Sequence, residues 1–83
     1  MYYVYRIQSE RDDSRFYTGF TEDLKKRIKA HNKGSNKSTA PYRPWELVFY
    51  TAFDQRERAL EFERYLKTGS GKAFARKRLW SDP

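Results

Sequence analysis

The sequence of 83 residues contains no cysteine and only one histidine. Without cysteine the chain cannot form disulfides, a thiolate zinc site or a cysteine nucleophile. The single His31 excludes a metal cluster built from several histidines, so a bound metal would be a hard ion held by oxygen ligands. Functional chemistry is therefore expected from carboxylates, phenols, cationic side chains and this one imidazole.

Long apolar runs are also missing. No stretch approaches the roughly 20 apolar residues that a helix needs to span a bilayer. Residues 2–7 alternate aromatic and polar side chains, unlike the apolar run and small-residue cleavage site of a signal peptide. These absences predict a cytoplasmic protein with no membrane partner. The length predicts one domain, residues 1–83, with a modest core.

Acidic residues are absent from two segments that are rich in bases. The chain has 18 Lys+Arg against 11 Asp+Glu, a formal net charge of +7. No acid lies between Leu24 and Trp45 or between Lys67 and Arg78. Blocks of one sign attract polyanions, and nucleic acid is the commonest of these. The alternative is a solvated basic surface that only aids solubility.

A hairpin and a helix are predicted in the first half of the chain. Residues 2–7 and 16–20 are rich in aromatic and β-branched side chains and favour two strands, joined as a hairpin. In that pairing Tyr5 and Tyr17 fall on the same face. Thr21 is expected to cap a helix that runs to about His31.

The second half of the chain predicts a strand between a loop and two helices. Asp54 can cap the first of these helices, and Phe74 and Leu79 would anchor the second. The third strand is apolar enough to be central in the sheet. The expected order is a polar loop at 32–45, a strand at 46–52, a helix at 55–68, a break at 69–71 and a short basic helix at 72–80.

Glu63 and Arg27 each have a functional and an ordinary interpretation. A single carboxylate such as Glu63 can hold one Mg²⁺ or Mn²⁺ when waters and substrate phosphate complete the coordination. The alternative is an i, i+4 ion pair with Lys67. The Arg27 fork can grip two phosphate oxygens, or Arg27 can be one more solvated base.

Two tyrosines and the histidine have similar alternatives. Tyr5 and Tyr17 could take a proton from water only if a cation or a metal-bound water network favours the phenolate, because a phenol has a pKa of about 10. Otherwise they pack a small core. His31 could contact phosphate or relay a proton, or it could interact with the last carbonyls of its helix.

The order and spacing of these residues resemble the GIY-YIG nuclease superfamily, in particular its small stand-alone members. The family opens with strands bearing Gly-Ile-Tyr-like and Tyr-Ile-Gly-like tripeptides, which read Tyr3-Val4-Tyr5 and Tyr17-Thr18-Gly19 here. The resemblance covers nearly the whole chain, and residues 43–48 share it. The family carries an arginine ten residues after the second tyrosine and a histidine one turn later, which match Arg27 and His31. It also carries a later glutamate followed by a lysine four residues on, which match Glu63 and Lys67.

This resemblance implies an α/β (α+β) fold with a three-stranded antiparallel sheet flanked by helices. It also implies one Mg²⁺ or Mn²⁺ on Glu63 and hydrolysis of a DNA phosphodiester by an activated water. Arg27 would stabilise the pentacovalent phosphate. One of Tyr5 and Tyr17 would assist the nucleophile; family members differ in which, and Tyr17 is favoured here. His31 and Lys67 would support them.

These observations predict a metal-dependent, endonuclease-like domain that acts on DNA, including branched or damaged forms. No small-molecule cofactor is expected, and specificity would be low or supplied by a protein partner. The residues expected to bind nucleic acid are Lys26, Lys33, Lys37, Arg43, Lys67, Lys72 and Arg76.

Two alternatives come from other functional classes. The first is a nucleic-acid-binding module that has lost turnover, because Tyr3 replaces the first glycine of the family and Ala75 replaces an asparagine that many catalytic members carry. The second is a protein–protein adaptor that uses Tyr42 and Trp45 as exposed aromatics.

Overall fold

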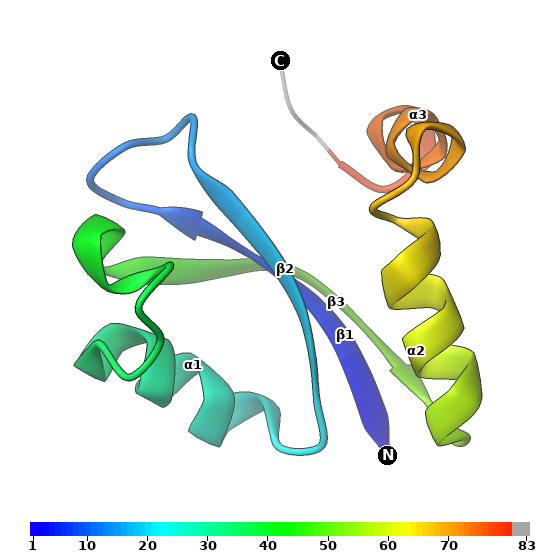
Figure 1. The fold of residues 1–83 in the computed structure, drawn as a ribbon, viewed down its shortest axis with the longest axis horizontal. Coiled ribbons are helices and arrows are strands. Elements are labelled where there is room, and N and C mark those ends of the chain that lie inside the picture. The colour runs from blue at the N-terminus through cyan, green and yellow to red at the C-terminus, as the bar shows by residue number, and fades with distance from the viewer. Residues whose placement is uncertain (81–83) are drawn as a thin grey trace.

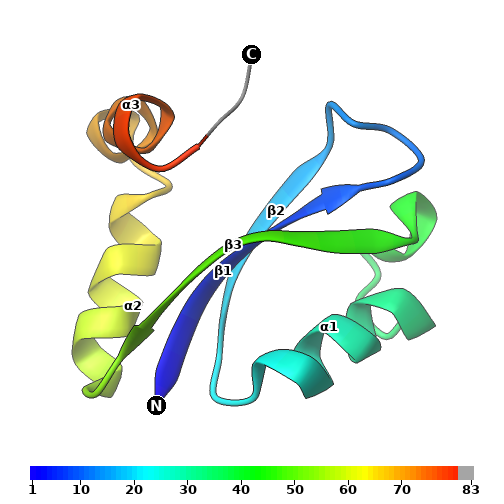
Figure 2. The same cartoon turned by 180° about the vertical axis from the view of Figure 1, so that it is seen from behind.

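A computed structural model of the protein describes residues 1–80. It consists of a three-stranded sheet with helices on both faces (Figures 1 and 2). The elements in chain order are β1 (Tyr2–Ser9), β2 (Phe16–Thr21), α1 (Leu24–Lys33), the 3-10 turn η1 (Ala40–Tyr42), β3 (Trp45–Phe53), α2 (Arg56–Tyr65) and α3 (Gly69–Arg78).

The sheet is antiparallel throughout, with the strand order β2-β1-β3. This confirms the predicted three-stranded antiparallel sheet. The prediction that the third strand is central was wrong, because β3 is an edge strand and β1 lies in the middle. Every second side chain of β3 faces solvent, and Val48 and Tyr50 are 43% and 53% exposed. The apolar residues of β3 are divided between the two faces of the sheet, because Trp45 and Leu47 join the core under α1 and Phe53 joins the core under α2 and α3.

Two separate cores lie on the two faces of the sheet. On one face Val4 packs with Ala59, Leu66 and Ala75, beneath α2 and α3. On the other face a second core forms beneath α1. Figures 1 and 2 show α1 on one side of the sheet and α2 with α3 on the other. Because side chains alternate along a strand, the central β1 contributes to both cores. The buried residues of the second core are Tyr5, Ile7 and Trp45.

Helix α1 begins two residues later than the sequence suggested. Its N-cap is Asp23, whose carboxylate accepts a hydrogen bond from the Lys26 amide at 3.1 Å. Thr21 instead ends β2, and its hydroxyl accepts from the Asp23 amide. The helix ends at Gly34, which has a left-handed φ of 85°. It is therefore extended beyond His31 to Lys33.

The loop after α1 folds inward onto the sheet. Trp45 is only 5% exposed, and its indole N–H donates to the Thr39 carbonyl at 2.8 Å. Tyr42 is half-buried, with the Arg15 guanidinium 4.4 Å from its ring centroid. An adaptor built on exposed Tyr42 and Trp45 is therefore wrong, because both rings pack against the protein itself.

Helix α2 begins after Gln55, not Asp54, and α3 starts three residues earlier than predicted. The Gly69–Ser70–Gly71 segment forms the first turn of α3, and the hydroxyl of its N-cap Thr68 accepts from the Gly71 amide at 3.0 Å. The break expected there was wrong because the Thr68 cap restarts the helix at once. Among residues 1–80 no helix is long and apolar enough to cross a membrane.

The side of α3 that faces the core also differs from the prediction. Phe74 is 39% exposed and packs on Tyr65, whereas Ala75 is buried against the sheet. Leu79 joins the same core as expected. The position at which the resemblance suggests an asparagine therefore carries a small apolar side chain inside the core.

Candidate active site

Tyr5 lies in the middle of β1 and is completely buried. Gly19 of β2 is its direct partner across the sheet. A Cβ atom at this glycine would lie 2.6 Å from the Tyr5 hydroxyl oxygen and 2.8 Å from the carbon that bears it. Gly19 therefore leaves the space that the Tyr5 phenol occupies, which gives the second tripeptide a physical reason for its glycine.

The Tyr5 hydroxyl is the centre of a chain of hydrogen bonds that links β1 to α1. Arg27 donates from Nε to this oxygen at 3.2 Å, and His31 Nε2 lies 2.7 Å from it. On the other side of the imidazole, Nδ1 lies 2.8 Å from the Thr39 hydroxyl. Residues from β1, α1 and the following loop are thus joined in one polar network inside the second core.

The protons of this network can be assigned from its two ends. Arg27 can only donate, so the Tyr5 oxygen accepts from it and turns its own proton towards His31. Thr39 donates to the Asn36 carbonyl at 3.4 Å and so accepts from His31 Nδ1. His31 is therefore the neutral tautomer with Nε2 unprotonated. In this assignment each buried polar atom has a partner, as it does throughout residues 1–80.

The surroundings favour the neutral forms of Tyr5 and His31. Burial raises the pKa of the Tyr5 phenol, although the hydrogen bond from Arg27 opposes this shift. Burial and the positive charge of Arg27 both lower the pKa of His31. The hydrogen bond to Tyr5 raises the pKa of Arg27 further, so its guanidinium is the permanent charge of the network.

Tyr17 stands beside this network on the edge strand β2. Its ring centroid lies 6.4 Å from that of Tyr5 and 5.1 Å from that of His31. The predicted placement of the two tyrosines on one face is therefore correct as geometry. Tyr17 is only partly buried and also lines an open pocket. Of the two phenols, Tyr17 is the one that a substrate can reach.

Glu63 lies on α2 and is the carboxylate of the candidate active site. Its side chain is 15% exposed, and Lys67 one turn later forms an ion pair with it at 2.6 Å. The i, i+4 pair considered in the sequence is therefore present. Lys67 lines the same pocket as Tyr17, so the ion pair lies near the accessible phenol.

The side chains around Glu63 could hold a Mg²⁺ or Mn²⁺ ion only if water and phosphate supply most of its ligands. Residues 1–80 contain no group of three or more acidic or histidine side chains that could enclose a metal. One partly buried carboxylate suits a hard ion that keeps most of its coordination for water and phosphate oxygens. The phenol of Tyr17 adds a further oxygen nearby. The Lys67 ammonium would have to give up part of its contact with Glu63 to admit the ion.

The residues predicted to bind nucleic acid fall into two groups. Lys26, Lys33 and Lys37 are exposed on α1 and the loop after it, and Arg43 lies over Gly34 and donates to the Ala40 carbonyl at 2.9 Å. The second group lies near α3 and consists of three basic side chains that line one pocket. Its members are Lys67, Lys72 and Arg76.

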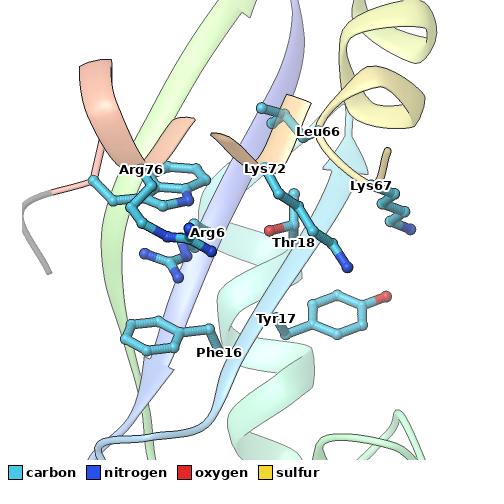
Figure 3. A pocket seen from close by; sticks show the side chains of 9 residues that line it. Arg6, Phe16, Tyr17, Thr18, Leu66, Lys67, Lys72 and Arg76 are labelled. Atoms are coloured by element: carbon cyan, nitrogen blue, oxygen red, sulfur yellow. The ribbon is translucent and has the colours of Figure 1, made fainter. Parts of the chain in front are cut away.

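That pocket adds residues that the sequence did not single out. Figure 3 shows Arg6 and Phe16 from the sheet on one side and Lys72 extending from α3 above Tyr17. Thr39, which fixes the His31 tautomer, was also missed. Neither Arg6 nor Thr39 belongs to a recognisable motif. Strand alternation, which places Arg6 on the face opposite Tyr5, was the only signal available.

Comparison with known proteins gives consistent matches over most of the chain. The family model described as the GIY-YIG catalytic domain matches residues 1–78. A UPF0213 protein of Streptococcus pyogenes serotype M5 (strain Manfredo) is 39% identical over 66 residues, which cover 78% of this chain and 70% of the relative. Another, from serotype M3 (strain SSI-1), is 43% identical over 56 residues, which cover 66% of this chain and 61% of the relative.

Proposed function

The chain belongs to the GIY-YIG nuclease family, and we propose that it is a metal-dependent endonuclease that hydrolyses phosphodiester bonds in branched or damaged DNA. The observation that carries this proposal is the network of Arg27, Tyr5 and His31 with Tyr17 beside it. Glu63 is linked to the pocket that Tyr17 lines through its ion pair with Lys67. A phenol, a guanidinium and a carboxylate around one reachable point are the groups that phosphodiester hydrolysis requires.

Arg27 would bind the phosphate that is attacked. Its Nε is directed at Tyr5, which fixes the plane of the guanidinium and orients its other nitrogens. Because these donors are held before the substrate arrives, they can stabilise the charge that develops on the phosphate without further reorganisation. Tyr5 is then a positioning residue, since its hydroxyl is buried and already has two partners.

Tyr17 would assist deprotonation of the attacking water. It is the accessible phenol of the pair, because it is only partly buried and lines the open pocket. His31 holds Tyr5 through the short hydrogen bond to Nε2 and does not reach solvent, because it is 1% exposed. We therefore assign the protonic role to Tyr17 and a supporting role to His31.

Glu63 would hold the divalent ion, and Lys67 would stay close enough to contact the substrate phosphate. A bound Mg²⁺ or Mn²⁺ would polarise the phosphoryl oxygens and offset their negative charge. Until then the ion pair with Lys67 holds the Glu63 carboxylate in one place. DNA is the partner that the net charge of +7 favours.

A second function, nucleic-acid binding without turnover, has one observation in its favour. Ala75 is buried in the core, so no amide from this position can reach the site. A protein of this kind would bind DNA with a steep salt dependence and cut it with neither Mg²⁺ nor Mn²⁺.

Cleavage assays distinguish the two functions. Purified protein is incubated with plasmid, nicked and forked DNA in the presence of Mg²⁺ or Mn²⁺. We expect cutting that Glu63→Gln abolishes and that Tyr17→Phe slows by about 100-fold or more, the usual contribution of a positioned acid–base group. Glu57→Gln, an exposed carboxylate on the same helix, is the matched control and should cut like the wild type.

Cutting that is undiminished in Glu63→Gln would contradict the proposed endonuclease. Binding to DNA without any cutting by the wild type would leave the binding module as the function.

A further inference from the structure

The pocket of Figure 3 lies between the β1–β2 side of the sheet and helix α3 and has a volume of about 380 Å³. Tyr17 forms one of its walls and also contacts His31 in the candidate active site. Tyr17 is therefore shared by the pocket and the candidate active site. Its cationic and aromatic lining comprises Arg6, Lys67, Lys72, Arg76, Phe16 and Trp80.

The charge of this pocket is entirely positive. No acidic side chain is among its lining residues, which are all within the described part of the chain. Lys72 and Arg76 are one turn apart on α3, and neither has an ion pair or hydrogen bond from its side chain to any of residues 1–80. Two adjacent cations without a partner among these described residues leave a place for an anion.

The aromatic rings of the pocket hold Arg6 in a fixed plane. The guanidinium carbon lies 3.7 Å from the Phe16 ring centroid and 4.2 Å from that of Trp80. Cation–π contacts on both faces keep this side chain extended along the pocket wall. Each ring therefore has one face covered by Arg6, which leaves the lining better suited to a sugar and its phosphate than to a stacked base.

The size of the pocket limits the ligand. Pockets for small ligands have volumes of about 300–1,000 Å³, so this one has room for a single nucleotide unit and not for a duplex. In proteins that bind single strands, a positively charged groove follows the backbone, and the basic lining of this pocket offers the same contact. A strand that is unpaired next to the scissile bond would fit.

We propose that this pocket receives the backbone of an unpaired DNA strand that continues from the cutting site, with its phosphate bound by Lys72 and Arg76. The inference rests on the proposed function, because it takes DNA as the substrate. It narrows the substrate class to DNA with a single-stranded arm.

Binding without metal tests this inference apart from catalysis. Fluorescence anisotropy in EDTA measures the affinity of a labelled single strand and of a blunt duplex of the same length. The variant Lys72→Gln/Arg76→Gln is compared with Lys25→Gln/Lys29→Gln, which removes the same charge at the same spacing from the exposed side of α1. Circular dichroism checks that both variants are folded.

We expect Lys72→Gln/Arg76→Gln to weaken single-strand binding by about tenfold or more, and to reduce the slope of log K against log salt by about 1.4, which is two contacts at about 0.7 each. The control should stay within about twofold of the wild type, and blunt duplex binding should fall no more in one variant than in the other.

Equal single-strand affinities for the two variants would overturn the proposed pocket, as would an equally large loss with blunt duplex. The proposed function is tested separately, because cleavage that depends on Glu63 would still stand if the pocket failed. Conversely, if the protein never cuts DNA, the binding comparison still decides whether the pocket holds an unpaired strand.

Discussion

At the scale of single residues, His31 shows how a polar side chain can be buried without leaving a hydrogen-bonding group unpaired. It sits 1% exposed between Tyr5 and Thr39, and both ring nitrogens have partners. The hydrogen bond from Tyr5 requires the neutral imidazole, because a protonated Nε2 could not accept it. Burial and Arg27 lower the pKa of His31 from its ordinary 6.5.

This lowered pKa predicts a pH-dependent stability. The unfolded chain binds a proton at His31 below about pH 6.5, whereas the folded protein resists it, so the free energy of unfolding falls as the pH drops through this range. Urea unfolding between about pH 7.5 and about pH 5.5 measures the effect, in a window above the carboxylate pKa values.

His31→Gln supplies the control for this measurement. Glutamine does not titrate, so the variant should be less stable at neutral pH but should lose little more on acidification. If its stability falls as steeply with acid as that of the wild type, the neutral buried imidazole is contradicted.

At the scale of elements, the junction of α2 and α3 depends on one glycine. A Cβ atom at Gly71 would overlap the carbonyl group of Tyr65, where the last turn of α2 meets the first turn of α3. Gly69, in the same turn, has nothing within 4 Å of such an atom. The two glycines differ in their packing and not in backbone angle, since neither has a positive φ.

Alanine at the two positions should therefore have opposite effects. Gly69→Ala should stabilise the protein by about 0.4–1 kcal/mol, because alanine restricts the unfolded chain and meets no obstacle in the fold. Gly71→Ala should destabilise it by more than about 1 kcal/mol, because α3 must move away from α2. Urea midpoints measure both, and a Gly71→Ala protein as stable as the wild type would exclude this close packing.

At the scale of the whole molecule, the central strand β1 contributes to two cores that have no residue in common. Val4 belongs to the core under α2 and α3, and Tyr5 and Ile7 belong to the core under α1. Each core also contains one tryptophan, Trp80 in the first and Trp45 in the second. The two faces can therefore be followed separately.

Because both cores share β1, we expect them to unfold in one cooperative transition. Trp45→Phe leaves a fluorescent reporter in one core, and Trp80→Phe leaves it in the other. Within each variant, urea midpoints from tryptophan fluorescence and from far-UV circular dichroism should coincide, as two-state unfolding of a small protein requires. A fluorescence midpoint that precedes the dichroism midpoint in either variant would mean that the faces unfold independently.

Local patterns predicted the elements, whereas tertiary contacts decided their ends. The aromatic alternation at residues 2–7 and 16–20 sufficed for the hairpin, and the family resemblance sufficed for the fold. The start of α3 could not be predicted, because Gly71 looks like a helix breaker until its contact with Tyr65 is known. The edge position of β3 also depends on the partner strand, which its own composition does not specify.

The candidate site also contains residues that the sequence predicted and one that it did not. The grouping of Tyr5, Tyr17, Arg27 and His31 followed from spacing and resemblance and is present as geometry, while their catalytic roles stay a prediction. Thr39 was invisible to the sequence because a loop brings it to His31 from outside any motif.

Tyr5 and Arg6 are neighbours in the chain and yet serve opposite faces of the sheet. Inserting or deleting one residue just before them would turn Tyr5 towards the face of the pocket in Figure 3 and Arg6 towards the face of the candidate active site. It would also move Val4 and Ile7 to the wrong faces of the sheet. Length changes between the first two strands, at residues 10–15, would leave both faces intact. Relatives of this protein should therefore vary in length at that hairpin and keep an unbroken β1.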